Sequence, residues 1–447
     1  MSRRPTSEAK PREGRSRKTA RRILLAATAA LVLTAPGTRA GASTGATAWT
    51  GAAPTVAASP AAAWDQTESA APASPHDASV ETGSTIQAPP ATAPATGPLR
   101  TLPSATVEAI ETVITAVMSR VGVPGLSLAV GRGDALVFTN GYGLADAENF
   151  VPAKADTAYR LASVSKPMTA VAVLQLVEQG RLDLDAPVAQ YCPAFPAKRW
   201  PVTLRHLLGH RGGIRHYRDG EQPLTRRFSS LREGLSLFAD DPLEFEPGTR
   251  FRYSTYGYSL LGCAVEGATN RTYLEAVTEA VFVPAGMTRT GADDVQALVA
   301  NRARGYVRDA DGRLMNAALA DMSYKVPGGG LSGTAPDVAR FGLALLGGRL
   351  LETATLDDLL SPRDPVDEQT ETYGLAMPVA TRDGSREVWH LGGQEGASAA
   401  LYLRPDDGTV VAVLANLENV APLLLEMARS VARAVEVTVS EDRVGGR

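Results

Sequence analysis

Strand-like segments stand near both ends of the globular part of this sequence, with a long and mostly helical stretch between them. A hairpin pattern comes first, with strands at Leu126–Val130 and Ala135–Thr139 joined by Gly131-Arg132-Gly133-Asp134. Later strand patterns cover Glu387–Leu391, Ala399–Leu403 and Val410–Asn416. Because a strand needs a hydrogen-bonded neighbour, these distant segments are expected to close one antiparallel sheet around an inserted helical subdomain. Helices are predicted to flank this sheet at Ser104–Val121 and Pro422–Val435, so the fold class is α+β.

One internal segment is apolar on nearly all sides, and a serine and a lysine stand in front of it. Its apolar residues are Met168, Val171, Val173, Leu174, Leu176 and Val177, a pattern that predicts a helix buried at the centre of the protein. Ser163 and Lys166 are three residues apart, so they would lie one above the other on one helix face. Pro167 keeps the helix from beginning much before Ser163, because proline lacks an N–H and its ring clashes with an earlier carbonyl.

This arrangement predicts a serine nucleophile that is activated by its own lysine. A hydroxyl is a poor nucleophile without a base, and the positive end of the helix dipole would favour both an alkoxide at Ser163 and a neutral Lys166. The pattern alone is not specific, since Ser7-Glu8-Ala9-Lys10 matches it as well. The simpler interpretation of Ser163 is a helix N-cap followed by a solvated lysine, and only further sequence blocks can decide between the two.

The first hundred residues differ in composition from the rest. Residues 1–22 carry nine Lys or Arg and are followed by the apolar stretch Ile23–Ala35. This is typical of a secretory signal peptide, assigned to residues 1–40 and exported by the Sec or the twin-arginine route. A mitochondrial transit peptide is the competing interpretation, against which Glu8 and Glu13 argue. Residues 41–103, rich in Ala, Pro, Ser and Thr, predict a disordered linker, followed by a domain over residues 104–437 and a tail over residues 438–447.

The mature protein is therefore expected to be secreted and acidic. Removing residues 1–40, which hold ten basic and two acidic residues, changes the formal net charge from −3 to −11. A nucleic-acid partner is not expected at this charge. Ile23–Ala35 is too short to span a bilayer, so the mature protein is expected to have no transmembrane helix.

Two cysteines and three histidines each have alternative interpretations. Cys192 and Cys263 permit one disulfide, but Cys263 stands in an apolar, helix-like stretch that favours a buried thiol. His206, His210 and His216 suggest a metal only weakly, because no Glu follows His206 as in the H-E-x-x-H motif. We therefore expect neither a metal nor another cofactor.

Two further blocks carry residues that suit acyl transfer. Tyr253, in the block from Glu246 to Tyr258, is a candidate acid/base if the Lys166 cation lowers its pKa. Trp389-His390-Leu391-Gly392-Gly393 ends a predicted strand, where glycine would let a substrate lie along the strand edge. The N–H groups of Gly393 and Ser163 would together form an oxyanion hole.

In this order the three blocks resemble those of the penicillin-recognising serine hydrolases, which include class C β-lactamases, D-alanyl-D-alanine carboxypeptidases and related esterases. The resemblance covers about residues 105–437, and Gly213–Tyr217 with Tyr253-Ser254-Thr255 is most similar to the mitochondrial serine β-lactamase-like proteases and their bacterial relatives. It implies the β-lactamase/transpeptidase-like fold. It also implies that Ser163 is the nucleophile, Lys166 the general base and Tyr253 the proton shuttle, with His390 in the position of the cationic strand residue and Gly392 and Gly393 beside the oxyanion.

Two departures from the family pattern affect the expected substrate. Thr255 replaces an asparagine that would both donate and accept hydrogen bonds, and His390-Leu391-Gly392 replaces Lys-Thr-Gly. We therefore expect a poor β-lactamase. The predicted function is a secreted serine hydrolase acting through an acyl-enzyme on a small peptide, a cell-wall peptide or an ester, such as a D-alanyl peptidase or carboxypeptidase. The alternatives are an esterase of the same family and a catalytically weak binding or sensor protein.

Overall fold

The computed structural model describes residues 102–363 and 372–445. By its internal contacts the chain divides into Met1–Ala93 and Pro94–Arg447, and all described residues belong to the second part. The predicted signal peptide and nearly all of the predicted linker lie outside the described residues. No helix within the described ranges combines the length and the apolar character that a membrane span needs.

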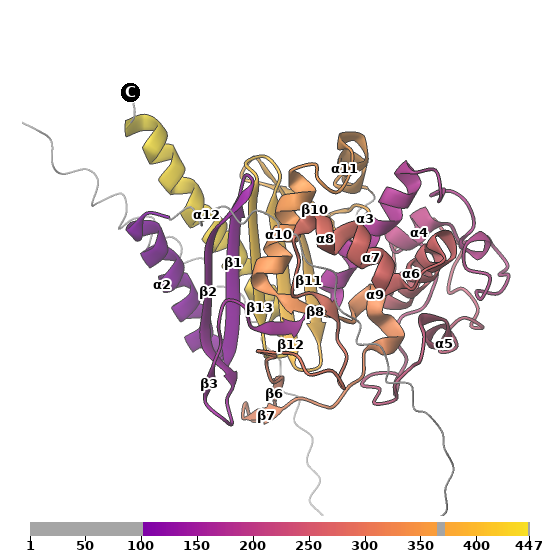
Figure 1. Ribbon diagram of the computed structural model, residues 1–447, viewed down its shortest axis with the longest axis horizontal. Coiled ribbons are helices and arrows are strands. Elements are labelled where there is room, and N and C mark those ends of the chain that lie inside the picture. The colour runs from indigo at the N-terminus through magenta and orange to yellow at the C-terminus, as the bar shows by residue number, and fades with distance from the viewer. Residues whose placement is uncertain (1–101, 364–371, 446–447) are drawn as a thin grey trace, which may run out of the picture. The chain divides into compact units, whose positions relative to one another are not determined.

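An eight-stranded antiparallel sheet is built from both ends of the domain, as the sequence predicts (Figure 1). The hairpin strand β1 pairs along its length with β13 from the other end of the domain, from Leu126 opposite Ala415 to Arg132 opposite Thr409. In sheet order the strands are β3 (Val151–Pro152), β2 (Ala135–Asp146), β1 (Gly125–Arg132), β13 (Thr409–Ala415), β12 (Ala397–Arg404), β11 (Ser385–Gln394), β10 (Pro378–Arg382) and β9 (Thr372–Tyr373).

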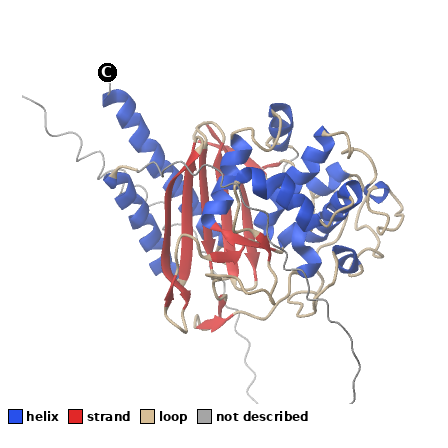
Figure 2. Ribbon diagram, viewed as in Figure 1, coloured by secondary structure: helices blue, strands red, loops and turns tan. Residues whose placement is uncertain are grey.

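Helices cover both faces of this sheet (Figure 2). On one face, α2 (Ser104–Val121) and α12 (Ala421–Gly445) pack on alternate strand residues such as Leu128 and Val413. On the other face, α10 (Ala335–Leu346) packs against β1 and β13. Ala129 of β1 and Ala412 of β13 belong to the hydrophobic core on this face. Because both faces are buried, the central strands are apolar at almost every position rather than at every second one.

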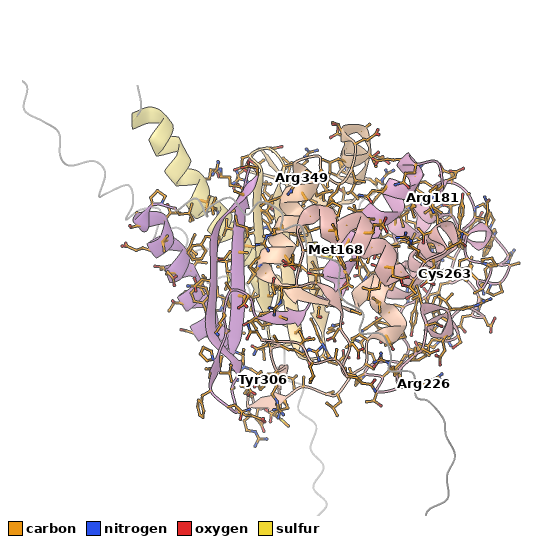
Figure 3. All side chains as sticks on the ribbon, in the orientation of Figure 1. Met168, Arg181, Arg226, Cys263, Tyr306 and Arg349 are labelled. Atoms are coloured by element: carbon orange, nitrogen blue, oxygen red, sulfur yellow. A yellow bond between two sulfur atoms is a disulfide. The ribbon has the colours of Figure 1, made fainter. Side chains whose placement is uncertain are left out.

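The helical subdomain lies between β4 and β9 in the chain and is centred on α3 (Ser165–Glu178). Met168 of α3, labelled in Figure 3, is completely buried, which agrees with the predicted central helix. The remaining helices are α4 (Leu204–Leu208), α5 (Leu231–Leu235), α6 (Thr255–Thr269), α7 (Tyr273–Val277), α8 (Val283–Ala285), α9 (Val326–Gly329) and α11 (Thr353–Leu359), with shorter helical turns η1 (Ala162–Val164), η2 (Val188–Gln190), η3 (Thr278–Phe282) and η4 (Ser323–Lys325). Short strands form two small sheets, β4 (Ala158–Arg160), β8 (Leu331–Thr334) and β5 (Gly291–Ala292) in one, β6 (Tyr306–Arg308) and β7 (Leu314–Asn316) in the other.

Two details of the sequence interpretation are wrong. Cys263 is not a free thiol, because it forms a disulfide with Cys192. The two Cα atoms are 5.4 Å apart. The two residues come together because the middle of α6 and the loop after η2 fold against one core, which their spacing of 71 residues does not reveal. The last helix also continues to Gly445, well beyond Val435 and into the segment predicted as a tail.

Candidate active site

Ser163 lies in the helical turn η1, directly in front of α3. The α-helix begins at Ser165, two residues later than the sequence suggests, because Ala162 adopts a left-handed backbone with a φ of 47°. The Ser165 hydroxyl donates to the Ala162 carbonyl oxygen over 2.7 Å and fixes this turn. Ser163 is partly exposed, whereas Ala162, Val164 and Ser165 are buried. The turn therefore presents one accessible hydroxyl, and strained backbone of this kind is common where a reactive group is held in place.

Lys166 is completely buried beside Ser163. Its Nζ lies 3.0 Å from the Ser163 Oγ, 3.2 Å from the Thr255 Oγ1 and 2.5 Å from the Gly328 carbonyl oxygen. None of these three partners carries a charge. Burial lowers the pKa of Lys166 well below its usual value, with a smaller contribution from the positive charge of Lys325. A neutral amine has two hydrogens and one lone pair, which suits two acceptor oxygens and the Ser163 hydroxyl. The amine can therefore accept the proton of Ser163.

Tyr253 stands on the other side of the same hydroxyl. Its phenol forms a hydrogen bond with Ser163, and the Lys166 Nζ lies 4.8 Å from the centre of its ring. The expectation that Lys166 lowers the pKa of Tyr253 is wrong, because burial raises the Tyr253 pKa. The cause is that Lys166 itself favours the neutral form and supplies no stabilising cation. Tyr253 thus keeps its proton in the resting enzyme.

The two glycines at the end of β11 have different structural roles. A Cβ at Gly392 would lie 2.4 Å from the Leu161 carbonyl oxygen, so only glycine lets β11 approach the turn that carries Ser163. A Cβ at Gly393 would meet no atom within 4 Å, and Gly393 is exposed. The open strand edge expected for a substrate is therefore at Gly393. Gly392 instead allows β11 to pack closely against the turn that carries Ser163.

A chain of neutral hydrogen bonds runs behind Tyr253 and connects α6 to β11. The Ser254 N–H donates to the His210 Nδ1 over 3.2 Å, which leaves the proton of this imidazole on Nε2, 3.1 Å from the Tyr373 hydroxyl. The His390 Nδ1–H donates to the Leu391 carbonyl oxygen over 2.7 Å, so its Nε2 can accept from Tyr373 at 3.4 Å. The His210 ring also packs on Tyr253, with centroids 4.2 Å apart.

His390 therefore does not act as a cationic strand residue. Both of its nitrogens are engaged, and burial lowers its pKa to about 3. Burial likewise lowers the pKa of His210 well below the usual value. The sequence analysis considered His210 only as a weak metal candidate and gave no signal for Tyr373, because their contact joins segments 163 residues apart.

Lys325 is a second buried lysine that sequence reasoning missed. It is 2% exposed and lies at the end of η4, three residues before the Gly328 carbonyl that binds Lys166. Its Nζ lies 5.0 Å from the ring centre of Tyr217 and 5.3 Å from that of Tyr324. Burial lowers its pKa to about 8, which the Glu395 carboxylate opposes. Its positive charge faces the same group of side chains as Lys166 and His216.

Comparisons with known proteins agree with this geometry. The sequence profile of the family described as Beta-lactamase matches residues 110–436. The human protein "Serine beta-lactamase-like protein LACTB, mitochondrial" is 29% identical over 422 residues, covering 70% of this chain and 77% of its own. The crystal structure of a penicillin-binding protein from Bacillus halodurans aligns with a TM-score of 0.63 at 29% identity, covering 72% of this chain and 98% of the other. The D-amino acid amidase of Ochrobactrum anthropi, complexed with L-phenylalanine amide, aligns with a TM-score of 0.64 at 25% identity, covering 76% and 100%.

Proposed function

The chain belongs to the beta-lactamase family and is a serine hydrolase, and from this premise we propose that it hydrolyses amide bonds of small D-alanyl or related peptides through an acyl-enzyme on Ser163. The observation that carries the proposal is the completely buried Lys166, which lies 3.0 Å from the Ser163 hydroxyl and has only uncharged hydrogen-bond partners. A lysine in this state is a base, whereas a solvated lysine after an N-cap serine would be a cation.

In the proposed reaction the Ser163 oxygen attacks the scissile carbonyl carbon while Lys166 takes the hydroxyl proton. The oxyanion that forms is stabilised by the N–H groups of Ser163 and Gly393. Tyr253 gives its proton to the departing nitrogen as the carbon–nitrogen bond breaks, and the proton on Lys166 restores the phenol. Water then enters, loses a proton to the same groups and hydrolyses the ester, which frees Ser163.

The neutral strand residue supports a preference against β-lactams. A substrate carboxylate at the end of β11 would meet His390, which has a pKa of about 3 and both nitrogens engaged, and Leu391, which has no hydroxyl. We therefore propose weak β-lactamase activity and a substrate whose recognition depends on uncharged groups. The similarity to a solved D-amino acid amidase supports an amide as the scissile bond.

Fluorophosphonate labelling with mass mapping tests the proposal. Trypsin should leave Ser163 and Ser165 in one peptide, because Pro167 blocks cleavage after Lys166, so fragment ions must assign the adduct. We expect the adduct on Ser163 and its loss in Ser163→Ala, followed by turnover of D-alanyl peptides. Absence of an adduct in the folded wild type would refute the proposal and favour a catalytically weak binding protein. An adduct with turnover of esters only would favour the esterase alternative.

We also propose that the mature protein is exported. The Cys192–Cys263 disulfide supports this, because disulfides form and persist mainly in oxidising compartments. Cell fractionation with alkylation of free thiols tests it. Recovery of the protein in the cytoplasm with both thiols free would contradict the proposal.

A further inference from the structure

His216 is held in a fixed position at the start of α6, next to the proposed proton shuttle. Its Nδ1 accepts the Thr255 N–H over 3.3 Å, and its ring meets that of Tyr253 edge-on at 5.7 Å and that of Tyr217 at 4.2 Å. The Thr255 N–H belongs to the first turn of α6, whose amides have no partner within the helix. His216 therefore caps this helix through Nδ1, which places the imidazole proton on Nε2.

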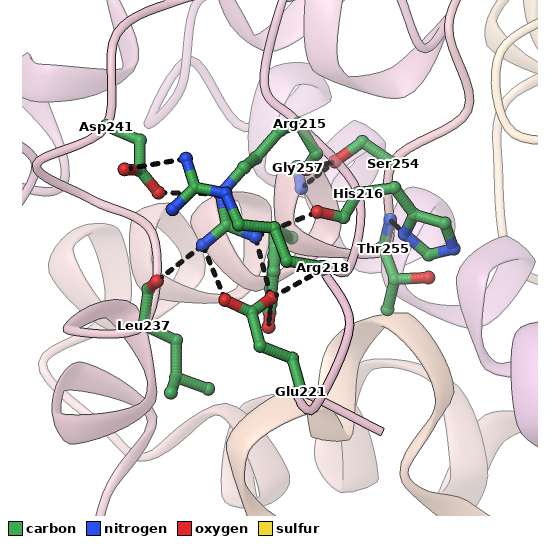
Figure 4. Close-up of polar contacts among 10 residues, drawn as sticks. Arg215, His216, Arg218, Glu221, Leu237, Asp241, Ser254, Thr255 and Gly257 are labelled. Atoms are coloured by element: carbon green, nitrogen blue, oxygen red, sulfur yellow. Dashed lines mark hydrogen bonds and ion pairs between the residues drawn. The ribbon is translucent and has the colours of Figure 1, made fainter. Parts of the chain in front are cut away.

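The residue before His216 anchors it to the body of the subdomain (Figure 4). Arg215 is 5% exposed, and its guanidinium binds Glu221 through both terminal nitrogens, at 2.7 and 2.8 Å, and Asp241 through Nε at 2.6 Å. It also donates to the carbonyl oxygens of Leu237 and His216. The Arg215 carbonyl in turn accepts from the Ser254 hydroxyl over 2.8 Å. Five donated hydrogen bonds use the full capacity of an arginine, so the backbone that carries His216 is rigid.

The His216 Nε2–H is a neutral donor in this part of the site that is left for a ligand. Among the described residues no hydrogen bond to this atom is formed, and the side chain is partly exposed. The Thr255 hydroxyl, which occupies the family's asparagine position, is instead engaged with Lys166 at 3.2 Å. The imidazole stays neutral, because burial lowers its pKa to about 4, with smaller contributions from the positive charges of Lys325 and Arg252, which the Glu221 carboxylate opposes. A neutral N–H donor suits a carbonyl oxygen and gives a carboxylate no charge pairing.

We propose that the His216 Nε2–H binds a carbonyl oxygen on the acyl side of the substrate, so that the enzyme selects N-acylated amino-acid donors over plain fatty acyl donors. This rests on the proposed function, because it assigns specificity to the acyl-enzyme reaction at Ser163. His216 acts as a specificity-determining residue and takes no part in proton transfer.

Two p-nitrophenyl esters isolate the proposed contact. N-acetyl-D-alanine p-nitrophenyl ester and p-nitrophenyl propionate differ only in the acetamido group, and the L-enantiomer of the first is measured alongside. The readout is the ratio of kcat/KM between the acetamido ester and the propionate. Using a ratio removes any uniform change in the amount or activity of folded enzyme.

His216→Asn keeps an oxygen that can cap the Thr255 N–H but has no donor at the position of Nε2, whereas His216→Gln places an amide N–H near that position. We expect His216→Asn to lower the ratio about tenfold, which is typical for a lost hydrogen bond in a desolvated site, and His216→Gln to restore part of it. His206→Asn is the matched control, because the His206 Nδ1 accepts the Thr203 N–H over the same 3.3 Å at the start of α4. Its ratio should equal that of the wild type.

The outcomes separate this inference from the proposed function. A wild type without preference for either acetamido ester, an unchanged ratio in His216→Asn, or an equal fall in His206→Asn would each overturn the role of His216. If the fluorophosphonate adduct on Ser163 forms in the same samples, only this inference has failed. If the adduct does not form in the wild type, the proposed function has failed as well.

Discussion

Gly392→Ala tests whether β11 positions the turn that carries Ser163. The added Cβ would lie 2.4 Å from the Leu161 carbonyl oxygen, 3.1 Å from the Ala162 Cβ and 3.2 Å from the Ala399 Cβ. An ordinary contact with the carbonyl oxygen is about 3.4 Å, so the strand and the turn must separate by roughly 1 Å. A displacement of about this size at a catalytic group lowers the rate by about 100-fold, equivalent to about 2.7 kcal/mol in the activation free energy.

The expected result is a fall of about 100-fold in kcat for an activated ester, with a loss of roughly 1–3 kcal/mol in the free energy of unfolding from overpacking. Urea denaturation of the same preparation confirms that the variant is folded under assay conditions. Gly291→Ala is the control for activity, because a Cβ there meets no atom within 4 Å and Gly291 stands outside the site on β5. Gly393→Ala is the control for stability on the same strand, since its Cβ also meets open space. A folded Gly392→Ala variant with wild-type kcat would refute the reasoning.

Three further predictions follow from charge and covalent structure. Lys325→Met removes a positive charge that lowers the Lys166 pKa, so the acidic limb of the kcat/KM profile should move to higher pH, and an unmoved limb or a flat profile from pH 5 to 9 would exclude Lys166 as the base. The Cys192→Ala/Cys263→Ala double variant should lose about 4 kcal/mol of unfolding free energy in urea without reductant, as expected for a loop of 71 residues; a loss below about 1 kcal/mol would contradict this. His390 has a folded pKa of about 3, below its unfolded value, so the unfolded state binds the proton first as the pH falls. Protonation of His390 should therefore lower the free energy of unfolding by roughly 3 kcal/mol from pH 6.5 to pH 4. This contribution should be absent in a folded His390→Phe variant.

The sheet and the central helix were predictable because their signals are local. The strand segment Val410–Ala415 is continuously apolar because both of its faces are covered, and α3 is apolar on nearly all sides because it lies at the centre of the helical subdomain. The approach of Lys166 to Ser163 was also predictable, since three residues of helical chain bring the two side chains together. In each case the prediction depended only on residues within one short segment of the chain.

The start of α3 and the pairing of the cysteines were not predictable on the same grounds. The helix starts at Ser165 because Ala162 is left-handed and β11 presses against Leu161, a contact made possible by Gly392 more than 200 residues later. Cys263 looked like a buried thiol because its own segment is apolar, and only the fold brings Cys192 to it. Contacts between distant segments decided both features.

The charge of the site is set by burial rather than by residue type, and this determines the direction of proton transfer in the proposed reaction. Lys166, His210 and His390 would all be cations if they were solvated at low pH, yet burial lowers the pKa of each of them. When Lys166 takes the proton of Ser163, it becomes a buried cation near Lys325 without a carboxylate among its hydrogen-bond partners. The burial that makes Lys166 a base therefore also makes its protonated form a strong acid. The proton is then driven onward through Tyr253, whose raised pKa favours the protonated phenol, toward the departing nitrogen.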